Sequence, residues 1–114
     1  MFQWSKMGKL FDPRSVTGIP WIHEFAQAPA TLLFDKFIRI YFSCRPPADN
    51  AGRYVSYCAF VDVDRSDLKT ILRVSPQPVL PLGARGTFDE FGTYPISVIR
   101  NGGEVMAYYG GWTR

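Results

Sequence analysis

The chain is poor in several residues that enzymes use most often. Its 114 residues include one histidine and two cysteines, and only 20% of them are charged. Cys44 and Cys58 lack metal-ligand spacing, so we expect no metal and no cofactor, and free buried thiols are favoured over a disulfide. The sequence also has no nucleophile elbow, phosphate loop or zinc motif. Enzymes built on a serine nucleophile or a metal are therefore disfavoured.

Long apolar runs and clusters of like charge are missing as well. No stretch approaches the ~20 apolar residues of a membrane span, and Met1 to Lys6 are not followed by the apolar segment of a signal peptide. We therefore expect a cytoplasmic protein with no membrane partner. The net charge of +3 is spread thinly, and since nucleic-acid binding needs a focused basic patch, no nucleic-acid partner is expected either.

Apolar and aromatic residues, in contrast, are plentiful. They make up 46% and 16% of the chain, which is typical of a folded protein with sheets or with surfaces that stack on sugars. Prolines and glycines break residues 1–28 into a loop-like segment. The apolar patterns that follow predict four strands, at 31–34, 37–44, 53–63 and 71–74. Four successive strands form a meander, which is the unit of a β-propeller blade.

Two further patterns favour a propeller over a sandwich. The strands around 38–42 and 54–61 carry apolar groups on both faces, as in a sheet that neighbours cover on both sides. The segment 75–83 is too rich in proline for a central strand and is typical of a crossing between blades. A second unit then begins near Tyr94, and Asn101-Gly102 predicts a hairpin turn between its two strands.

An internal repeat supports the same interpretation. Glu24 to Pro29 is echoed by Glu90 to Pro95, and each copy precedes an apolar hairpin that ends in paired aromatics. Repeated units of this kind point to propellers and arrays. We therefore predict an all-β fold, an incomplete β-propeller in one domain. It comprises an N-terminal loop segment, a first four-stranded blade and the two-stranded start of a second, at 1–28, 29–82 and 83–114.

Several segments, taken together, resemble a known family. They lie at 9–13, 25–29, 38–45 and 86–95. They look like the N-terminal part of a five-bladed β-propeller glycosidase of the arabinanase, levansucrase and β-mannoside phosphorylase-like superfamily. The resemblance covers nearly the whole chain. It implies a carbohydrate partner, hydrolysis or phosphorolysis of a glycosidic bond as the parent activity, and an active site at the central axis, on the loops that open each innermost strand.

The repeat indicates the same location for catalytic groups. Glu24 and Glu90 occupy equivalent places just ahead of the innermost strands, as do His23 and Asp89. Glycosidic cleavage needs two carboxylates, one to protonate the leaving oxygen and one to act as nucleophile or base. The catalytic candidates are Asp89, Glu90 and Glu24, and solvent-facing loop carboxylates are the alternative. Because the resemblance implies that a later blade supplies the general acid, we expect the isolated chain to be inactive.

Five other residues are candidates for binding the sugar. The amide of Gln27 is suited to a sugar hydroxyl or to a loop amide, and the rings of Tyr94 and Trp112 to sugar stacking or to packing. Arg45, like Arg39 on the same strand, is suited to an anionic group, to Asp89 or Glu90, or to lying over apolar surface. The candidates are His23, Gln27, Arg45, Tyr94 and Trp112.

The open end of the predicted fold suggests self-association. Ladder pairing stops at the last predicted strand, 104–110, so its edge and the exposed blade faces should be adhesive. We therefore expect a homo-oligomer through open blade edges. Two other functions stay open, a non-catalytic carbohydrate-binding or self-assembling module, and a remnant with a structural role only.

Overall fold

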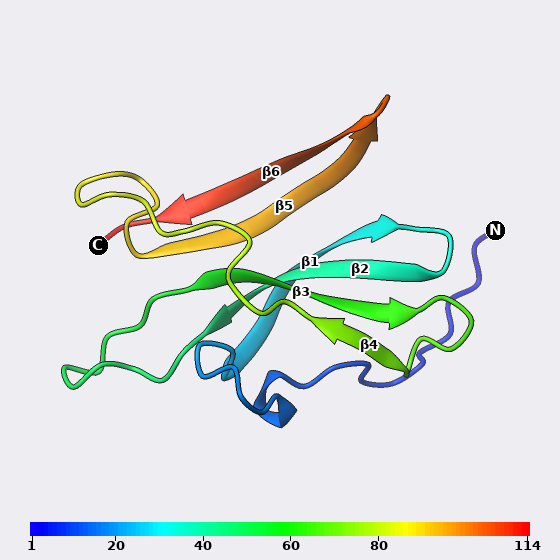
Figure 1. The fold of residues 1–114 in the computed structure, drawn as a ribbon, viewed down its shortest axis with the longest axis horizontal. Helices are drawn as coiled ribbons and strands as arrows, with labels where there is room; N and C mark the ends of the chain where they lie inside the picture. Colours follow the sequence, from blue (N-terminus) through cyan, green and yellow to red (C-terminus); the bar gives the residue numbers. More distant parts are fainter.

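The computed structural model describes residues 1–114, and six β-strands form nearly all of its regular structure. No helix in it has the length and apolar character of a membrane span. The predicted all-β fold is confirmed. A four-stranded antiparallel sheet has the order β1-β2-β3-β4, and β5 and β6 form a separate antiparallel pair (Figure 1). The strands are β1 (Glu24–Leu33), β2 (Phe37–Arg45), β3 (Tyr57–Asp64), β4 (Ile71–Val74), β5 (Gly92–Asn101) and β6 (Glu104–Trp112), preceded by a short 3₁₀ helix, η1 (Pro13–Ser15).

Two predicted boundaries are wrong. β1 begins at Glu24, inside the predicted loop segment, because two register shifts let its irregular start still pair with β2. β3 begins at Tyr57 rather than at Arg53. The Asp49 carboxylate accepts hydrogen bonds from the backbone N–H groups of Ala51 and Arg53, at 2.9 Å each, and this holds the segment in a turn.

The two copies of the sequence repeat form similar hairpins. β1 pairs with β2 and β5 pairs with β6, and each first strand has a register shift beside the repeated proline, Pro29 or Pro95. Glu24 and Glu90 are not equivalent, however. Glu24 is the first residue of β1, whereas Glu90 lies before β5 begins at Gly92. The two copies therefore align in their hairpins but not in the carboxylates ahead of them.

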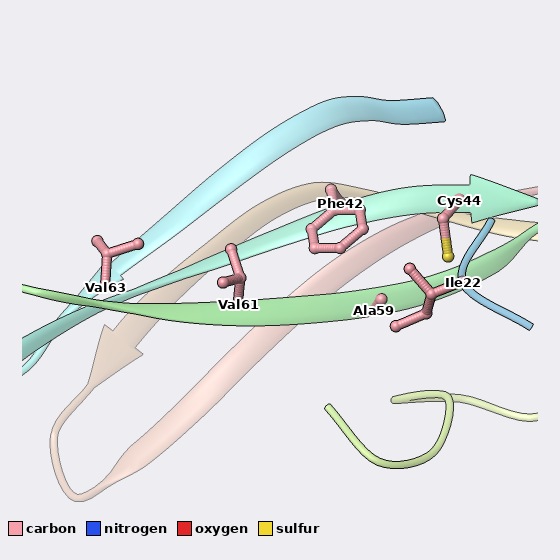
Figure 2. Packing of buried hydrophobic residues seen from close by; sticks show 6 residues of the cluster. All are labelled: Ile22, Phe42, Cys44, Ala59, Val61 and Val63. Carbon is pink, nitrogen blue, oxygen red and sulfur yellow. The ribbon is translucent and has the colours of Figure 1, made fainter. Parts of the chain in front are cut away.

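The core face of the four-stranded sheet, which carries Phe42 and Val61, is covered by the N-terminal segment (Figure 1). The rings of Phe11 and Phe42 pack with centroids 5.2 Å apart, and those of Trp21 and Tyr57 with centroids 5.8 Å apart. Figure 2 shows the buried cluster between β2, β3 and the chain ahead of β1. Its members are Ile22, Phe42, Cys44, Ala59, Val61 and Val63.

The opposite, hairpin face of this sheet carries Arg39 and Arg45 and faces the β5–β6 hairpin, of which β5 contacts β1, β2 and β3 (Figure 1). Thr93 fastens the two layers, because its carbonyl accepts from Ser43 Oγ at 3.3 Å and its hydroxyl from the Cys58 N–H at 3.2 Å. β5 packs chiefly against β1. Farther along, the layers enclose an apolar cavity of about 180 Å³, so this contact is less complete than the core face.

The two thiols are free and buried, as the sequence predicts. In the β2–β3 ladder Cys44 lies opposite Tyr57, and Cys58 lies opposite Ser43. Neighbouring positions on a strand point to opposite faces, so the two sulfurs lie on different sides of the sheet. Burial raises the pKa of Cys44 to about 12 and that of Cys58 to about 11. Both thiols are therefore neutral and unreactive at ordinary pH.

Candidate functional site

Four of the five predicted sugar-binding residues line one cleft of about 260 Å³. It lies where the start of β1 and β5 meets the end of β2 and β6. Its lining combines an amide, two serine hydroxyls, two aromatic rings, one of them a phenol, and one guanidinium, with no carboxylate. We call it the Arg45 cleft, lined by Gln27, Ala28, Ser43, Arg45, Ser56, Tyr94 and Trp112.

The start of β1 reaches this cleft through an unusual backbone. Phe25 and Ala28 have φ angles of 64° and 51°, in the left-handed region that residues with a Cβ seldom adopt. Each lies within one of the two register shifts of β1, so each is part of a bulge. Bulges re-aim side chains, and strained residues cluster at functional sites. Here they bring Ala28 to the cleft and place the Phe25 ring beside Arg45.

Close backbone approach positions the two aromatic rings. Trp112 Nε1 donates to Ser56 Oγ at 2.7 Å, which fixes the indole across the layers. Any Cβ at Gly92 would collide with both of those atoms. In the same way a Cβ at Gly110 would enter the ring of Tyr94. Glycine is therefore required at both positions for the rings to lie as they do.

The guanidinium of Arg45 has no hydrogen-bonding partner in the protein. Its Nε is buried without an acceptor, and no carboxylate lies within 4.0 Å of the group. Its Cζ lies 5.3 Å from the Phe25 ring centroid and 5.4 Å from that of Tyr54. Aromatic faces attract a cation within about 6 Å. The two rings flank the guanidinium without using its hydrogen-bond donors, of which Nε is closed to solvent.

Asp89 is buried, but it does not line this cleft. Its carboxylate accepts from the hydroxyl of Thr87 at 2.9 Å and from that of Tyr109 at 3.0 Å. The hydrogen bond to Asp89 raises the pKa of Tyr109. A Cβ at Gly111 would come within 2.5 Å of the Cβ of Asp89. In this structure Asp89 fastens its loop to the end of β6.

The other predicted catalytic groups lie apart as well. Glu90 Oε2 accepts from the backbone N–H of Gly86 at 2.7 Å and so closes its own turn. Glu24 lines a different cleft, with Asp12 and Arg14. His23 lies beside Glu24, with its Nδ1 3.8 Å from Oε1. None of the three predicted catalytic carboxylates lines the Arg45 cleft, and their catalytic roles stay predictions.

Sequence reasoning overlooked part of this cleft. Ser43 and Ser56 are buried polar residues at its floor, and Phe25 and Tyr54 flank the guanidinium. A signal for the serines was present, because both interrupt runs that are otherwise apolar. Nothing in the sequence pattern pointed to the ring pair, since it forms only once β1 and the loop before β3 lie beside the end of β2.

Comparisons with known proteins provide relatives but no function. The chain is 35% identical, over 109 residues, to the uncharacterized protein MT1551 of Mycobacterium tuberculosis strain CDC 1551 and equally to the uncharacterized protein Rv1502 of strain H37Rv. The match covers 96% of this chain and 34% of each relative, so the chain spans about a third of the length of these proteins. No family model matches the chain. No solved structure matches it.

Proposed function

We propose that this chain is the N-terminal part of a glycosidase-like β-propeller, and that its Arg45 cleft binds carbohydrate. The observation that carries the proposal is the convergence of Gln27, Arg45, Tyr94 and Trp112 on one cleft. Amides, hydroxyls and a guanidinium suit sugar hydroxyls, and aromatic faces suit the apolar face of a sugar ring. The chemistry of the lining therefore supports a glycan-binding site.

The arrangement of the strands supports the propeller part of the proposal. A blade is a four-stranded meander with its first strand innermost, and the first strands of adjacent blades lie side by side. The sheet β1-β2-β3-β4 has this order, and β5 packs chiefly against β1. In this interpretation β1–β4 form the first blade and β5–β6 open the second. The Arg45 cleft then lies at the start of two innermost strands.

The parent activity that we propose is hydrolysis or phosphorolysis of a glycosidic bond, with binding as the function of the isolated chain. Cleavage requires two carboxylates on either side of the scissile bond. Asp89 and Glu90 are engaged in their own loop, and Glu24 lines another cleft. Turnover would therefore need a carboxylate from further blades or from a second chain. A non-catalytic binding module is the alternative.

Binding can be tested by titrating neutral oligosaccharides into ¹⁵N-labelled protein and following the indole N–H signals. Trp112→Ala should abolish binding, whereas Trp4→Ala, which removes an indole that is 93% exposed in the N-terminal segment, should leave it unchanged. Because Trp112 also bonds Ser56, Tyr94→Ala serves as a second variant and Tyr108→Ala as its exposed control. Equal binding by all four variants would contradict the proposal.

Asp89→Asn separates the two classes of function. Loss of a weak hydrolytic activity in this variant would favour an enzyme. Binding that survives Asp89→Asn but not Trp112→Ala would favour a binding module. Asp89 also accepts hydrogen bonds from Thr87 and Tyr109, so the substitution can destabilise the fold. Loss of folding would identify Asp89 as structural.

We also propose that two copies of the chain associate through the outer face of β5 and β6. Large apolar side chains are exposed there, including Ile96, Ile99, Met106 and Tyr108. In a complete propeller the next blade would cover such a face. Light scattering over a range of concentrations should show a defined oligomer that Ile99→Lys disrupts and that Leu72→Lys, on β4, does not. A monomer at all concentrations would overturn this proposal.

A further inference from the structure

We infer that the Arg45 cleft recognises an anionic substituent on its ligand, a carboxylate or a phosphate carried by the sugar. This inference rests on the proposed carbohydrate function and names the class of glycan. It begins from a single unusual group. Arg45 lines a cleft that contains no carboxylate, and its buried Nε has no acceptor in the protein.

A buried N–H without an acceptor is uncommon in folded proteins and calls for an explanation. Arginine presents its donors as a planar fork that fits the paired oxygens of a carboxylate or a phosphate. Arg45 Nε itself has less than 1 Å² of accessible surface, so a ligand would be met by the two terminal nitrogens, which form the other donor edge of the guanidinium. An anion bound along that edge would neutralise the charge.

The surroundings prepare the group for such a ligand. Phe25 and Tyr54 place rings at 5.3 and 5.4 Å from Cζ, so the orientation is set without using any donor. No carboxylate lies within 4.0 Å of the group. Glu24, the partner of Arg45 in the β1–β2 ladder, makes no ion pair with it, and Asp49 bonds Arg53 at 2.9 Å.

The rest of the cleft suits the sugar that would carry the anion. Ser56 receives the Trp112 indole N–H and so holds that ring at the wall of the cleft. Gln27, from β1, adds an amide to the lining. A charged sugar would place its ring against the aromatic side chains and its acidic group on Arg45, and so would contact both parts of the lining. A free anion would contact Arg45 alone.

The test follows the Arg45 Nε–H signal and the Trp112 indole signal of the full chain in ¹⁵N spectra during four titrations. The probes are glucose, glucuronate, glucose 6-phosphate and inorganic phosphate. We expect the charged sugars to shift both signals and to bind at least about tenfold more tightly than glucose, as charge-assisted hydrogen bonds would give. Glucuronate against glucose 6-phosphate then distinguishes a carboxylate from a phosphate.

Variants locate the effect. Arg45→Gln should remove the preference for charged sugars, and Arg45→Lys should restore only part of it because a lysine lacks the fork. Arg85→Gln, which removes the same charge from an exposed turn, is the matched control and should bind like the wild type. Amide spectra of each variant verify its fold, and the wild-type Arg45 signal tests the inference without any substitution.

The outcomes separate this inference from the function on which it rests. Glucose and glucuronate binding equally, with the Arg45 signal unmoved, would overturn the anion site and leave the carbohydrate function standing. Inorganic phosphate binding at Arg45 while no sugar adds affinity would support the anion site and overturn the carbohydrate function. Absence of binding by all four probes would overturn both.

Discussion

Arg39 and Arg45 lie on the same face of β2, six positions apart, but only Arg39 forms an ion pair. Arg39 donates from two nitrogens to the carboxylate of Asp62, at 2.8 and 2.9 Å, and lies 3.8 Å over the Phe60 ring. This hydrogen-bonded carboxylate raises the pKa of Arg39. Arg45 has rings beside it but no carboxylate within 4.0 Å.

The difference comes from what lies opposite each arginine in the sheet. The β2–β3 ladder places Asp62 directly across from Arg39, so the two side chains meet on one face. Arg45 lies at the end of β2, past the last pair of that ladder, and its partner in β1 is Glu24. A bulge follows Glu24, and its carboxylate does not approach Arg45. One end of the strand is closed by an ion pair, and the arginine at the other end has none.

The largest loss of stability is expected from removing the ion pair between Arg39 and Asp62. Asp62→Ala would leave the Arg39 guanidinium, whose side chain is only 21% exposed, without its counter-charge. Removing one partner of a buried pair usually costs about 3 kcal/mol or more of unfolding free energy. Urea denaturation followed by circular dichroism measures it. The double variant Arg39→Met, Asp62→Leu should recover most of the loss, and a single variant as stable as the wild type would contradict the assignment.

The next effect tests how the open end is built. Gly92→Ala would drive a methyl group into Trp112 and Ser56, so we expect a loss of about 2 kcal/mol, typical of overpacking. The indole N–H signal of Trp112 should also shift as its hydrogen bond is lost. Gly103→Ala, at a position where a Cβ would meet nothing within 4 Å, is the matched control. Equal stability of the two variants would show that the cleft wall is not held by this contact.

The third prediction concerns the other face of the same strand end, where Cys44 is enclosed. An exposed thiol ionises near pH 9.0, whereas burial raises the pKa of Cys44 to about 12 in the folded chain. The unfolded chain therefore releases this proton first, and the stability contributed by the neutral thiol is complete below pH 9 and falls as the pH rises toward 12. The slope is about 1.4 kcal/mol per pH unit for each such thiol. Between pH 8 and 10.5 the unfolding free energy of Cys44→Ala, measured by denaturation, should fall less steeply with pH than that of the wild type. Identical slopes for the two proteins would contradict the burial of the Cys44 thiol.

Arg45→Gln is the counterpart of Asp62→Ala, and we expect it to change the unfolding free energy little. With no salt bridge or hydrogen bond to lose, the chain loses only contacts of the cation with two rings, about 1 kcal/mol or less. The same urea measurement applies. A loss as large as that of Asp62→Ala would mean that Arg45 is a structural group rather than one kept free.

The smallest effect is a gain. Ala28 has a φ of 51°, a conformation that glycine adopts without penalty. The relief of about 1–2 kcal/mol is partly offset by the greater freedom of glycine in the unfolded chain, so Ala28→Gly should stabilise by about 0.5 kcal/mol. Thermal denaturation measures it, with Ala30→Gly, in regular extended strand, as a control that should destabilise. A destabilised Ala28→Gly would argue against the strain.

Local patterns predicted most of the strands and one of the turns. The proline-rich stretch 75–83 contains no strand, and the hairpin predicted at Asn101-Gly102 is present, with Gly102 at a φ of 59°. Alternation and turn chemistry act over a few residues, which is why they can be read directly. The start of β1 was missed, because a strand containing two bulges and a proline lacks the regular period on which the prediction depends.

The candidate site, like the fold, was predicted only in part from the sequence. Gln27, Arg45, Tyr94 and Trp112 could be chosen from the sequence by residue type and by their place in the repeat, and they do line one cleft. The carboxylates were chosen by the same logic but lie elsewhere, held by Tyr109, by Gly86 and by the surroundings of another cleft. A repeat identifies equivalent positions in the chain, but hydrogen bonds between loops decide where a side chain points.

By itself, then, the sequence determined the all-β class, the paired hairpins and the residue types available for binding, since each depends on interactions between neighbours in the chain. Only the tertiary structure decided which of two similar arginines is paired and which is free. That choice depends on strand register, on two bulges in β1 and on rings from distant segments. Contacts between segments far apart in sequence have no local signature, because they form only when the layers pack.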